Sequence, residues 1–136
     1  MATVIKGKGI ERIDKSGKPG NIRFGIDQTR VDNPKIVMGH NLIQPSFRGR
    51  RHYHAKCNVG QYMISGRRRY LIGPDFAMEE IDLEPGDFIF IPQGEIHGTI
   101  NLSDTETSEL VFCYTGVNSK EEAGTYYIDP PKETKK

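Results

Sequence analysis

Short apolar segments separated by turn-forming residues make up most of the chain. These segments are rich in Val, Ile, Tyr and Phe and lie at residues 35–43, 58–65, 69–73, 87–92 and 108–116. Between them, Gly, Pro, Asn and Asp mark turns at short intervals. Segments of this kind suit β-strands, and their regular spacing predicts a sandwich or barrel of antiparallel strands.

A helical period is nearly absent from the sequence. The best candidate is residues 119–124, where Ser119 and Glu122 fit a capping box and Gly124 can end a single turn. The chain contains no internal repeat and no shift in composition, so residues 1–136 are predicted to form one domain. Residues 1–20 are expected to be an edge strand or loop, and residues 130–136 a mobile tail.

Composition narrows the class of function. The 19 Lys and Arg residues against 18 Asp and Glu give a formal charge of +1, which argues against a dedicated nucleic-acid binder. No apolar run approaches the roughly 20 residues that a membrane-spanning helix needs, so no membrane partner is expected. Cys57 and Cys113 follow no apolar export segment and are therefore predicted to be free thiols in a reducing cytoplasm.

Three histidines are the main candidates for chemistry. His52 and His54 are separated by one residue, so on a β-strand they share a face, while Arg51 and Tyr53 point away. His97 stands on a later strand, after a tight turn. Three neutral imidazoles can bind one iron, zinc, copper or nickel ion. Spacing alone leaves a second interpretation open, in which the histidine pair occurs by chance and the third is unrelated to it.

The segment around His97 resembles the second motif of the cupin superfamily. The pattern G-x5-P-x-G-x2-H-x3-N covers residues 86–101 and is matched at every fixed position, by Gly86, Pro92, Gly94, His97 and Asn101. The resemblance implies an all-β double-stranded β-helix, also called a jelly roll, with a metal ion held inside the barrel.

The segment from residue 46 to residue 66 resembles the first cupin motif in part. In the pattern G-x5-H-x-H-x3–4-E-x6-G, the two histidines fall at His52 and His54 and the closing glycine at Gly66. The leading glycine falls at Ser46, and the glutamate falls at Val59. The first motif therefore lacks its carboxylate ligand.

The resemblance carries the ligand role onto His52, His54 and His97 only. Such a site is either degenerate and empty or an all-histidine variant, and the presence of all three histidines favours an occupied site. Without a carboxylate the ion keeps its full +2 charge, which makes it a stronger Lewis acid and lets an anionic substrate chelate it. Iron(II) is the favoured ion, and zinc, nickel and manganese remain alternatives.

The resemblance also implies an activity. Three-histidine iron sites occur among cupins that cleave thiols or 1,3-diketones with oxygen, so we expect a dioxygenase-type enzyme for a small organic acid, phenol or dicarbonyl. A related Lewis-acid enzyme (an isomerase, cyclase or decarboxylase) is a second option. The alternative from another class is a non-catalytic cupin that binds or senses a small ligand such as a sugar. A homodimer is expected by analogy, with Tyr62 and Ile64 packing against a second sheet or subunit.

Three further side chains are candidates for the pocket. Gln61 should face the same cavity and can ligate the metal or hold a bound substrate; the alternative is a polar residue lining a wet pocket. His40 can be a fourth ligand, a general base or a partner of a ligand, but a hydrogen-bonded structural histidine is the simpler interpretation. Arg50 shares the face of the paired histidines and can bind an anionic substrate.

The remaining residues of interest are less specific. Cys57 as a thiolate would bind zinc or copper, although a small buried or loop cysteine is the simpler interpretation. The arginines at 67–69 are assigned to a hairpin turn with a solvated edge. Tyr114 and Phe90 are candidates for the cavity lining, and the sequence leaves their faces open.

Overall fold

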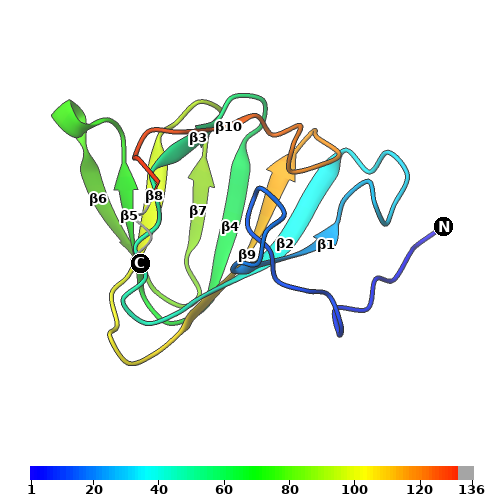
Figure 1. Cartoon of the computed structure of the whole chain (residues 1–136), viewed down its shortest axis with the longest axis horizontal. Helices are drawn as coiled ribbons and strands as arrows, with labels where there is room; N and C mark the ends of the chain where they lie inside the picture. The colour runs from blue at the N-terminus through cyan, green and yellow to red at the C-terminus, as the bar shows by residue number, and fades with distance from the viewer. Residues whose placement is uncertain (132–136) are drawn as a thin grey trace.

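The computed structural model describes residues 1–131 and places ten strands in two five-stranded antiparallel sheets (Figure 1). The strands are β1 (Ile22–Ile26), β2 (Ile36–Ile43), β3 (His52–His54), β4 (Val59–Ser65), β5 (Arg68–Ile72), β6 (Glu79–Leu83), β7 (Phe88–Ile91), β8 (His97–Asn101), β9 (Ser108–Thr115) and β10 (Thr125–Tyr127). Within these residues the only helical segment is the short 3-10 turn η1 (Asp75–Ala77). The all-β prediction is confirmed.

Strands that are distant in sequence lie side by side in each sheet. One sheet has the order β1-β2-β9-β4-β7 and the other β10-β3-β8-β5-β6. β2 pairs with β9 along its whole length, from Ile36 opposite Thr115 to Ile43 opposite Ser108. In the other sheet, His52 on β3 pairs with His97 on β8. The two histidine-bearing motifs are therefore brought together by one backbone pairing.

Alternating side chains from the two sheets form the core between them. Val37, Met63, Tyr70 and Leu110 come from four different strands and are almost completely buried. Each such side chain stabilises the fold by roughly 1.5–3 kcal/mol relative to an exposed position. This packing holds the strands that carry the histidines.

Two turns explain glycine positions of the first motif. Gly66 has φ 78°, and an added Cβ would lie 2.7 Å from the Cβ of Ser108, so a larger residue would meet both strain and a clash. Ser46 occupies the position of the leading glycine and keeps φ 62°. A non-glycine residue in this left-handed region costs roughly 1–2 kcal/mol. Ser46 therefore adopts, at this cost, a backbone conformation that glycine adopts without strain.

The predicted hairpin turn at residues 67–69 is wrong in its extent. β4 ends at Ser65 and β5 begins at Arg68, so the turn between them is short. Because side chains alternate along a strand, Arg68 shares the inward face of β5 with Tyr70 and Ile72. Its side chain is 2% exposed, which corrects the expectation of a solvated arginine.

Two expectations concern the C-terminal part of the chain. Residues 119–124 form a hydrogen-bonded turn in which the Glu122 amide donates to Ser119 Oγ at 3.1 Å, and Gly124 follows at φ 67°. The tail predicted at 130–136 falls largely outside the described residues, which stop at 131. Among residues 1–131, no helix has the length and apolar character required to span a bilayer.

Candidate metal centre

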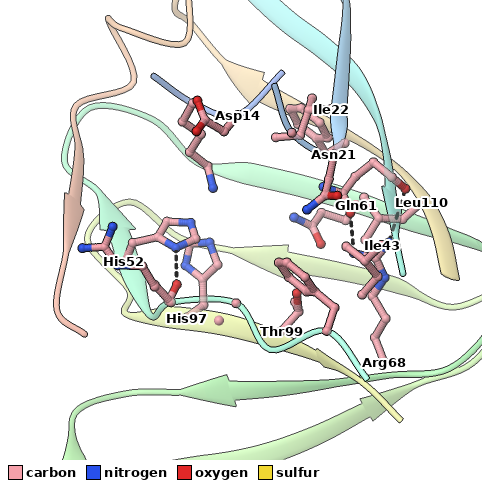
Figure 2. A pocket seen from close by; sticks show the side chains of 18 of the residues that line it. Asp14, Asn21, Ile22, Ile43, His52, Gln61, Arg68, His97, Thr99 and Leu110 are labelled. Atoms are coloured by element: carbon pink, nitrogen blue, oxygen red, sulfur yellow. Dashed lines mark hydrogen bonds between the residues drawn. The ribbon is translucent and has the colours of Figure 1, made fainter. Parts of the chain in front are cut away.

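Three histidine side chains meet on the inner face of the β3–β8 pair (Figure 2). His52, His54 and His97 are all buried, and one ring nitrogen from each lies within 4.8 Å of the others. Their ring centroids are separated by 4.4 Å for His52 and His97, 5.0 Å for His52 and His54, and 5.4 Å for His54 and His97. The structure thus brings together the three residues that the sequence singled out.

Hydrogen bonds orient each ring through its Nδ1 atom. Nδ1 of His52 lies 2.9 Å from the Arg50 carbonyl oxygen, and Nδ1 of His97 lies 2.9 Å from the Glu95 carbonyl oxygen. A carbonyl oxygen only accepts, so Nδ1 carries the proton in both rings and Nε2 keeps its lone pair. Nδ1 of His54 lies 2.9 Å from Thr125 Oγ1, which can accept in the same way. Partners of this kind are typical of metal-binding histidines.

Burial keeps the three imidazoles neutral. It lowers the pKa of His54 to about 3 and that of His97 to about 4, and it holds the pKa of His52 well below its usual value. The positive charge of Lys15 lowers all three further. A metal ion binding at neutral pH therefore has no ring proton to displace.

The group that surrounds the ion position contains no carboxylate. Among residues 1–131, the metal-binding cluster consists of His52, His54 and His97 alone. Val59, at the position of the motif glutamate, is buried in the core opposite Tyr114 and Ile91. A valine packed in this way cannot supply a ligand, so the donor set is three neutral nitrogens.

A pocket of about 380 Å³ opens in front of the histidines (Figure 2). Both sheets line it, together with the segment before β1 and with Tyr127 on β10. Tyr114 belongs to this lining, whereas Phe90 points outward and is exposed. The volume suits a small molecule rather than a polymer.

Gln61 also lines the pocket, as its position on β4 predicts. Its Oε1 accepts a hydrogen bond from the hydroxyl of Tyr70. Among the described residues no partner is recorded for its Nε2, so that amide group can donate to a bound molecule. This arrangement favours substrate contact over ligation, because the amide oxygen is already engaged.

His40 and Arg50 are placed differently from the trio. His40 lies on the outer face of β2, where Nδ1 accepts from Arg12 at 2.9 Å and Nε2 lies 2.8 Å from a Glu109 carboxylate oxygen. It is not among the pocket residues, so the structure does not bring it to the centre. Arg50 lines the pocket, but its guanidinium donates to the Asp129 carbonyl oxygen at 3.1 Å and covers the Tyr127 ring at 4.0 Å.

Cys57 is a poor ligand candidate in this fold. It is buried, it is not among the pocket residues, and burial raises the pKa of its thiol to about 11. The thiolate form that binds metal is therefore disfavoured at neutral pH.

Two cationic side chains of the pocket escaped the sequence analysis. Arg68 reaches the lining from β5, and burial lowers its pKa to about 10. Its alternation with Tyr70 and Ile72 was a signal that could have placed it inside. Lys15 reaches the pocket from the segment before β1, and no pattern in the sequence indicates that position.

Comparison with known proteins agrees with this geometry. The sequence model of the Cupin domain family matches residues 39–114, which is more than half of the chain. No curated protein sequence is similar enough to this chain to count as a match.

Several solved structures share the fold. A protein with a double-stranded β-helix domain from Klebsiella pneumoniae has a TM-score of 0.67 and 18% identity over 96% of this chain and 100% of its own. Oxalate oxidase in complex with the substrate analogue glycolate has a TM-score of 0.67 and 16% identity, over 90% of this chain and 62% of its own.

Oxalate decarboxylase from Bacillus subtilis has a TM-score of 0.65 and 20% identity, over 79% of this chain and 27% of its own length. At these identities the likeness establishes the fold alone, and it confirms the predicted double-stranded β-helix. Together with the matched family model and the two motifs, it shows that the chain belongs to the cupin family.

Proposed function

We propose that this cupin is a metal-dependent enzyme in which His52, His54 and His97 bind one iron(II) ion and in which the substrate is a small organic acid, phenol or dicarbonyl. The reaction type that we favour is dioxygenase chemistry, and redox-neutral Lewis-acid chemistry is the second option. When bound, the ion supplies a Lewis acid and, as iron, a redox centre for oxygen.

One observation carries the proposal. The buried rings of His52 and His97 offer unprotonated Nε2 atoms, and His54 offers one within the same 4.8 Å cluster. A pocket that only bound a sugar would gain nothing from three neutral imidazoles held with their lone pairs converging. Nitrogen donors without thiolate suit iron, nickel and zinc, and the open side toward the pocket leaves room for a further ligand.

The surroundings of the cluster favour an anionic substrate. Lys15, Arg50 and Arg68 all line the pocket. Asp14 is the one acidic residue of the lining, and its Oδ1 accepts hydrogen bonds from Ser16 and Lys18 within its own turn. A small acid would bring the negative charge that the site lacks. Oxalate oxidase and oxalate decarboxylase, which share the fold, act on such an acid.

In this proposal the protein residues orient the substrate and exclude water. Gln61 donates from Nε2 to an oxygen of the bound acid, while Tyr70 holds its Oε1. Ile43, Leu110 and Phe112 line the same pocket and shield the bound molecule from solvent. A dry, low-dielectric pocket strengthens every charge interaction within it.

Metal analysis followed by an activity screen tests the proposal. The protein is purified without added metal, its bound elements are measured, and uptake is titrated. We expect close to one ion per chain after reconstitution. A content below about 0.1 per chain with no uptake would instead favour a non-catalytic binding protein. With iron bound, oxygen consumption is then recorded over small acids, phenols and dicarbonyls. Turnover of an acid without oxygen uptake would select the Lewis-acid option.

We also propose a homodimer formed through the outer face of the β4–β7 pair. β7 is an edge strand, and Phe88 and Phe90 on it are 78% and 66% exposed. Tyr62 and Ile64 on β4 are exposed on the same outer face, so the second sheet of this chain does not cover them. Large apolar patches are rare on monomers, and a two-fold pairing would bury this one. Sedimentation of the Phe88→Ser/Phe90→Ser variant should then give a monomer; a monomeric parent protein would refute the proposal.

A further inference from the structure

The segment before β1 forms a loop over the pocket. This pocket loop, residues 12–21, is closed by Ile13, whose backbone exchanges hydrogen bonds of 2.7 and 2.9 Å with Ile22. Arg12 ties its base to β2 through His40, with Nη2 2.9 Å from Nδ1 of the ring. Gly20 passes so close that an added Cβ would lie 2.5 Å from the Asp14 amide nitrogen. The loop is thus held in place by backbone contacts at both ends.

The turn at the tip of the loop is built around Asp14. Its Oδ1 accepts from the Ser16 amide at 2.8 Å, from Ser16 Oγ at 2.6 Å and from the Lys18 amide at 3.0 Å. Figure 2 shows Asp14 across the pocket from His52 and His97. Its carboxylate is committed to hydrogen bonds within the turn, while its charge favours the ionised form of the neighbouring Lys15.

Lys15 stands next to Asp14 in this turn and lines the pocket. Its ammonium group forms no hydrogen bond or ion pair with residues 1–131. The group is close enough to His52, His54 and His97 for its charge to lower the pKa of each ring. Burial in turn lowers the pKa of Lys15 to about 8.

This placement is costly for a lysine. Lys15 is half-buried, and among the charged groups Asp14 alone favours its ionised form, so an ammonium that has lost part of its hydration would be stabilised by a further anion. Lys18, in the same turn, is exposed, so the turn itself does not require a lysine to point inward. An ammonium that faces three metal-binding rings would also repel the ion. A bound anion between the two positive charges removes both costs.

We propose that Lys15 is a specificity-determining residue that binds the negatively charged group of a small carboxylic acid while the same group is bound to the metal. The inference rests on the proposed metal centre and adds to it the residue that selects an anion over a neutral ligand. With an ion held by His52, His54 and His97, the carboxylate would lie between the ion and Lys15 and would accept a hydrogen bond from the Lys15 ammonium. No bond in the acid is made or broken in this binding step.

A role of Lys15 in anion binding predicts opposite changes in metal affinity and anion affinity, which a purely structural role would not give. Replacing Lys15 by methionine keeps most of the length of the side chain and removes its charge. The metal should then bind more tightly, because the repulsion is gone, while the anion should bind more weakly. If Lys15 only packed the loop against the barrel, loss of that packing would weaken both.

The experiment uses the cobalt(II)-loaded full-length protein, because cobalt(II) reports ligand binding by its visible absorption. Oxalate is the anionic probe and imidazole the neutral one. In Lys15→Met, we expect oxalate affinity to fall by about tenfold or more, as for loss of one charge-assisted hydrogen bond. Imidazole affinity should hold, and cobalt affinity, measured against a competing chelator, should rise. Lys18→Met, which removes an exposed lysine of the same turn, is the matched control and should match the parent in all three.

The outcomes distinguish failure of the proposed role of Lys15 from failure of the proposed metal centre. Oxalate affinity unchanged in Lys15→Met, or cobalt and oxalate affinity falling together, overturns the role of Lys15 and leaves the metal centre standing. A parent protein that takes up no cobalt overturns the metal centre itself, and the role of Lys15 falls with it. Circular dichroism of both variants establishes that the comparison is made between folded proteins.

Discussion

Two buried arginines in this molecule differ in whether a carboxylate balances their charge. Arg51, just before β3, is 6% exposed and turns away from the pocket. Its Nη2 lies 2.8 Å from an Asp129 carboxylate oxygen and also donates to Asp75, and these carboxylates raise its pKa. Gly98 on β8 makes room for its stem, since an added Cβ there would lie 3.1 Å from the Cγ of Arg51.

Arg68 is 2% exposed and has no carboxylate partner among the described residues. It donates to Ser108 Oγ at 2.9 Å, to Asn41 Oδ1 at 2.7 Å and to the carbonyl oxygens of the same two residues. All of these acceptors are neutral. Burial accordingly lowers its pKa to about 10, against the rise at Arg51.

The difference shows how charge is distributed between the inside and the outside of the barrel. Outside β3, a buried cation is balanced by two acids that tie the C-terminal segment and the η1 turn to the sheet. Inside, Lys15, Arg50 and Arg68 line a pocket whose one acid, Asp14, is engaged in a turn. The fold therefore balances its buried charge outside the barrel, while cationic side chains outnumber acidic ones in the pocket lining.

The largest effect is expected from removing one of the proposed metal ligands from the histidine cluster. His97→Ala should lower metal affinity by about 100-fold or more, because two imidazoles remain and no carboxylate stands nearby to replace the third. The fold should persist, since the core lies elsewhere. Bound metal is measured by elemental analysis after dialysis against a weak chelator. His40→Ala is the matched control and should retain the ion; unaltered metal content in His97→Ala would remove that residue from the site.

The second test compares the two arginines directly. Arg51→Met should cost about 2–3 kcal/mol of unfolding free energy, less than for a fully buried pair because Asp75 and Asp129 are 85% and 31% exposed. Arg68→Met should cost about 1 kcal/mol, because loss of a buried, unpaired charge offsets the acceptors left without a donor. Urea unfolding of both variants gives the two values. If Arg68→Met lowered the unfolding free energy more than Arg51→Met, the hydrogen bonds of Arg68 would be essential to the fold, and the proposed difference between the two arginines would be wrong.

The third test adds an acid to the pocket side. Val59→Glu places a carboxylate at the position of the glutamate in the first cupin motif, on the face of β4 that carries Gln61. The metal should bind about tenfold more tightly, and anionic ligands more weakly, because part of the positive charge is already neutralised. Cobalt titration followed by oxalate titration measures both. Val59→Gln controls for the change in shape, and a rise in oxalate affinity in Val59→Glu would show that this position does not face the ion.

The smallest expected effects are changes in how the free energy of unfolding depends on pH in the metal-free protein, in two pH ranges. Unfolded histidine has a pKa near 6.5, above the values of about 3 and 4 for His54 and His97 in the folded protein. The unfolded chain therefore takes up protons that the folded protein does not, so the free energy of unfolding falls as pH drops from about 6.5 to about 4. In that window, His97→Gln should reduce the slope by up to about 1.4 kcal/mol per pH unit.

The outer cluster titrates in a lower window. Arg51 lowers the pKa of Asp129, so the contribution of that carboxylate is present above its unfolded value near 3.9 and is lost as pH falls further. Asp129→Asn should flatten the curve below about pH 4 and leave the histidine window unchanged. Thermal unfolding across a pH series, with and without each substitution, separates the two regions. A single slope common to both variants would contradict the assignment.

Much of the site was accessible from the sequence because it depends on local geometry. The alternation of side chains along a strand places His52 and His54 on one face and Gln61 on the face of Val59. The fixed spacing of the second motif then supplies His97. Alternation along β2 also places His40 outward once Val37 is known to be buried, but nothing in the sequence shows which face of β2 is the inner one.

The strand period and the candidate ligand residues thus follow from the order of amino acids, since a strand alternates whatever surrounds it. The closed barrel decided which charged side chains form no ion pair. Arg68 is enclosed by Asn41 and Ser108, residues from two other strands, and Lys15 is turned inward by a loop anchored on β1 and β2. The loss of water around a charged side chain depends on contacts from segments that are far apart in the chain. Its extent is therefore set only when those segments pack together.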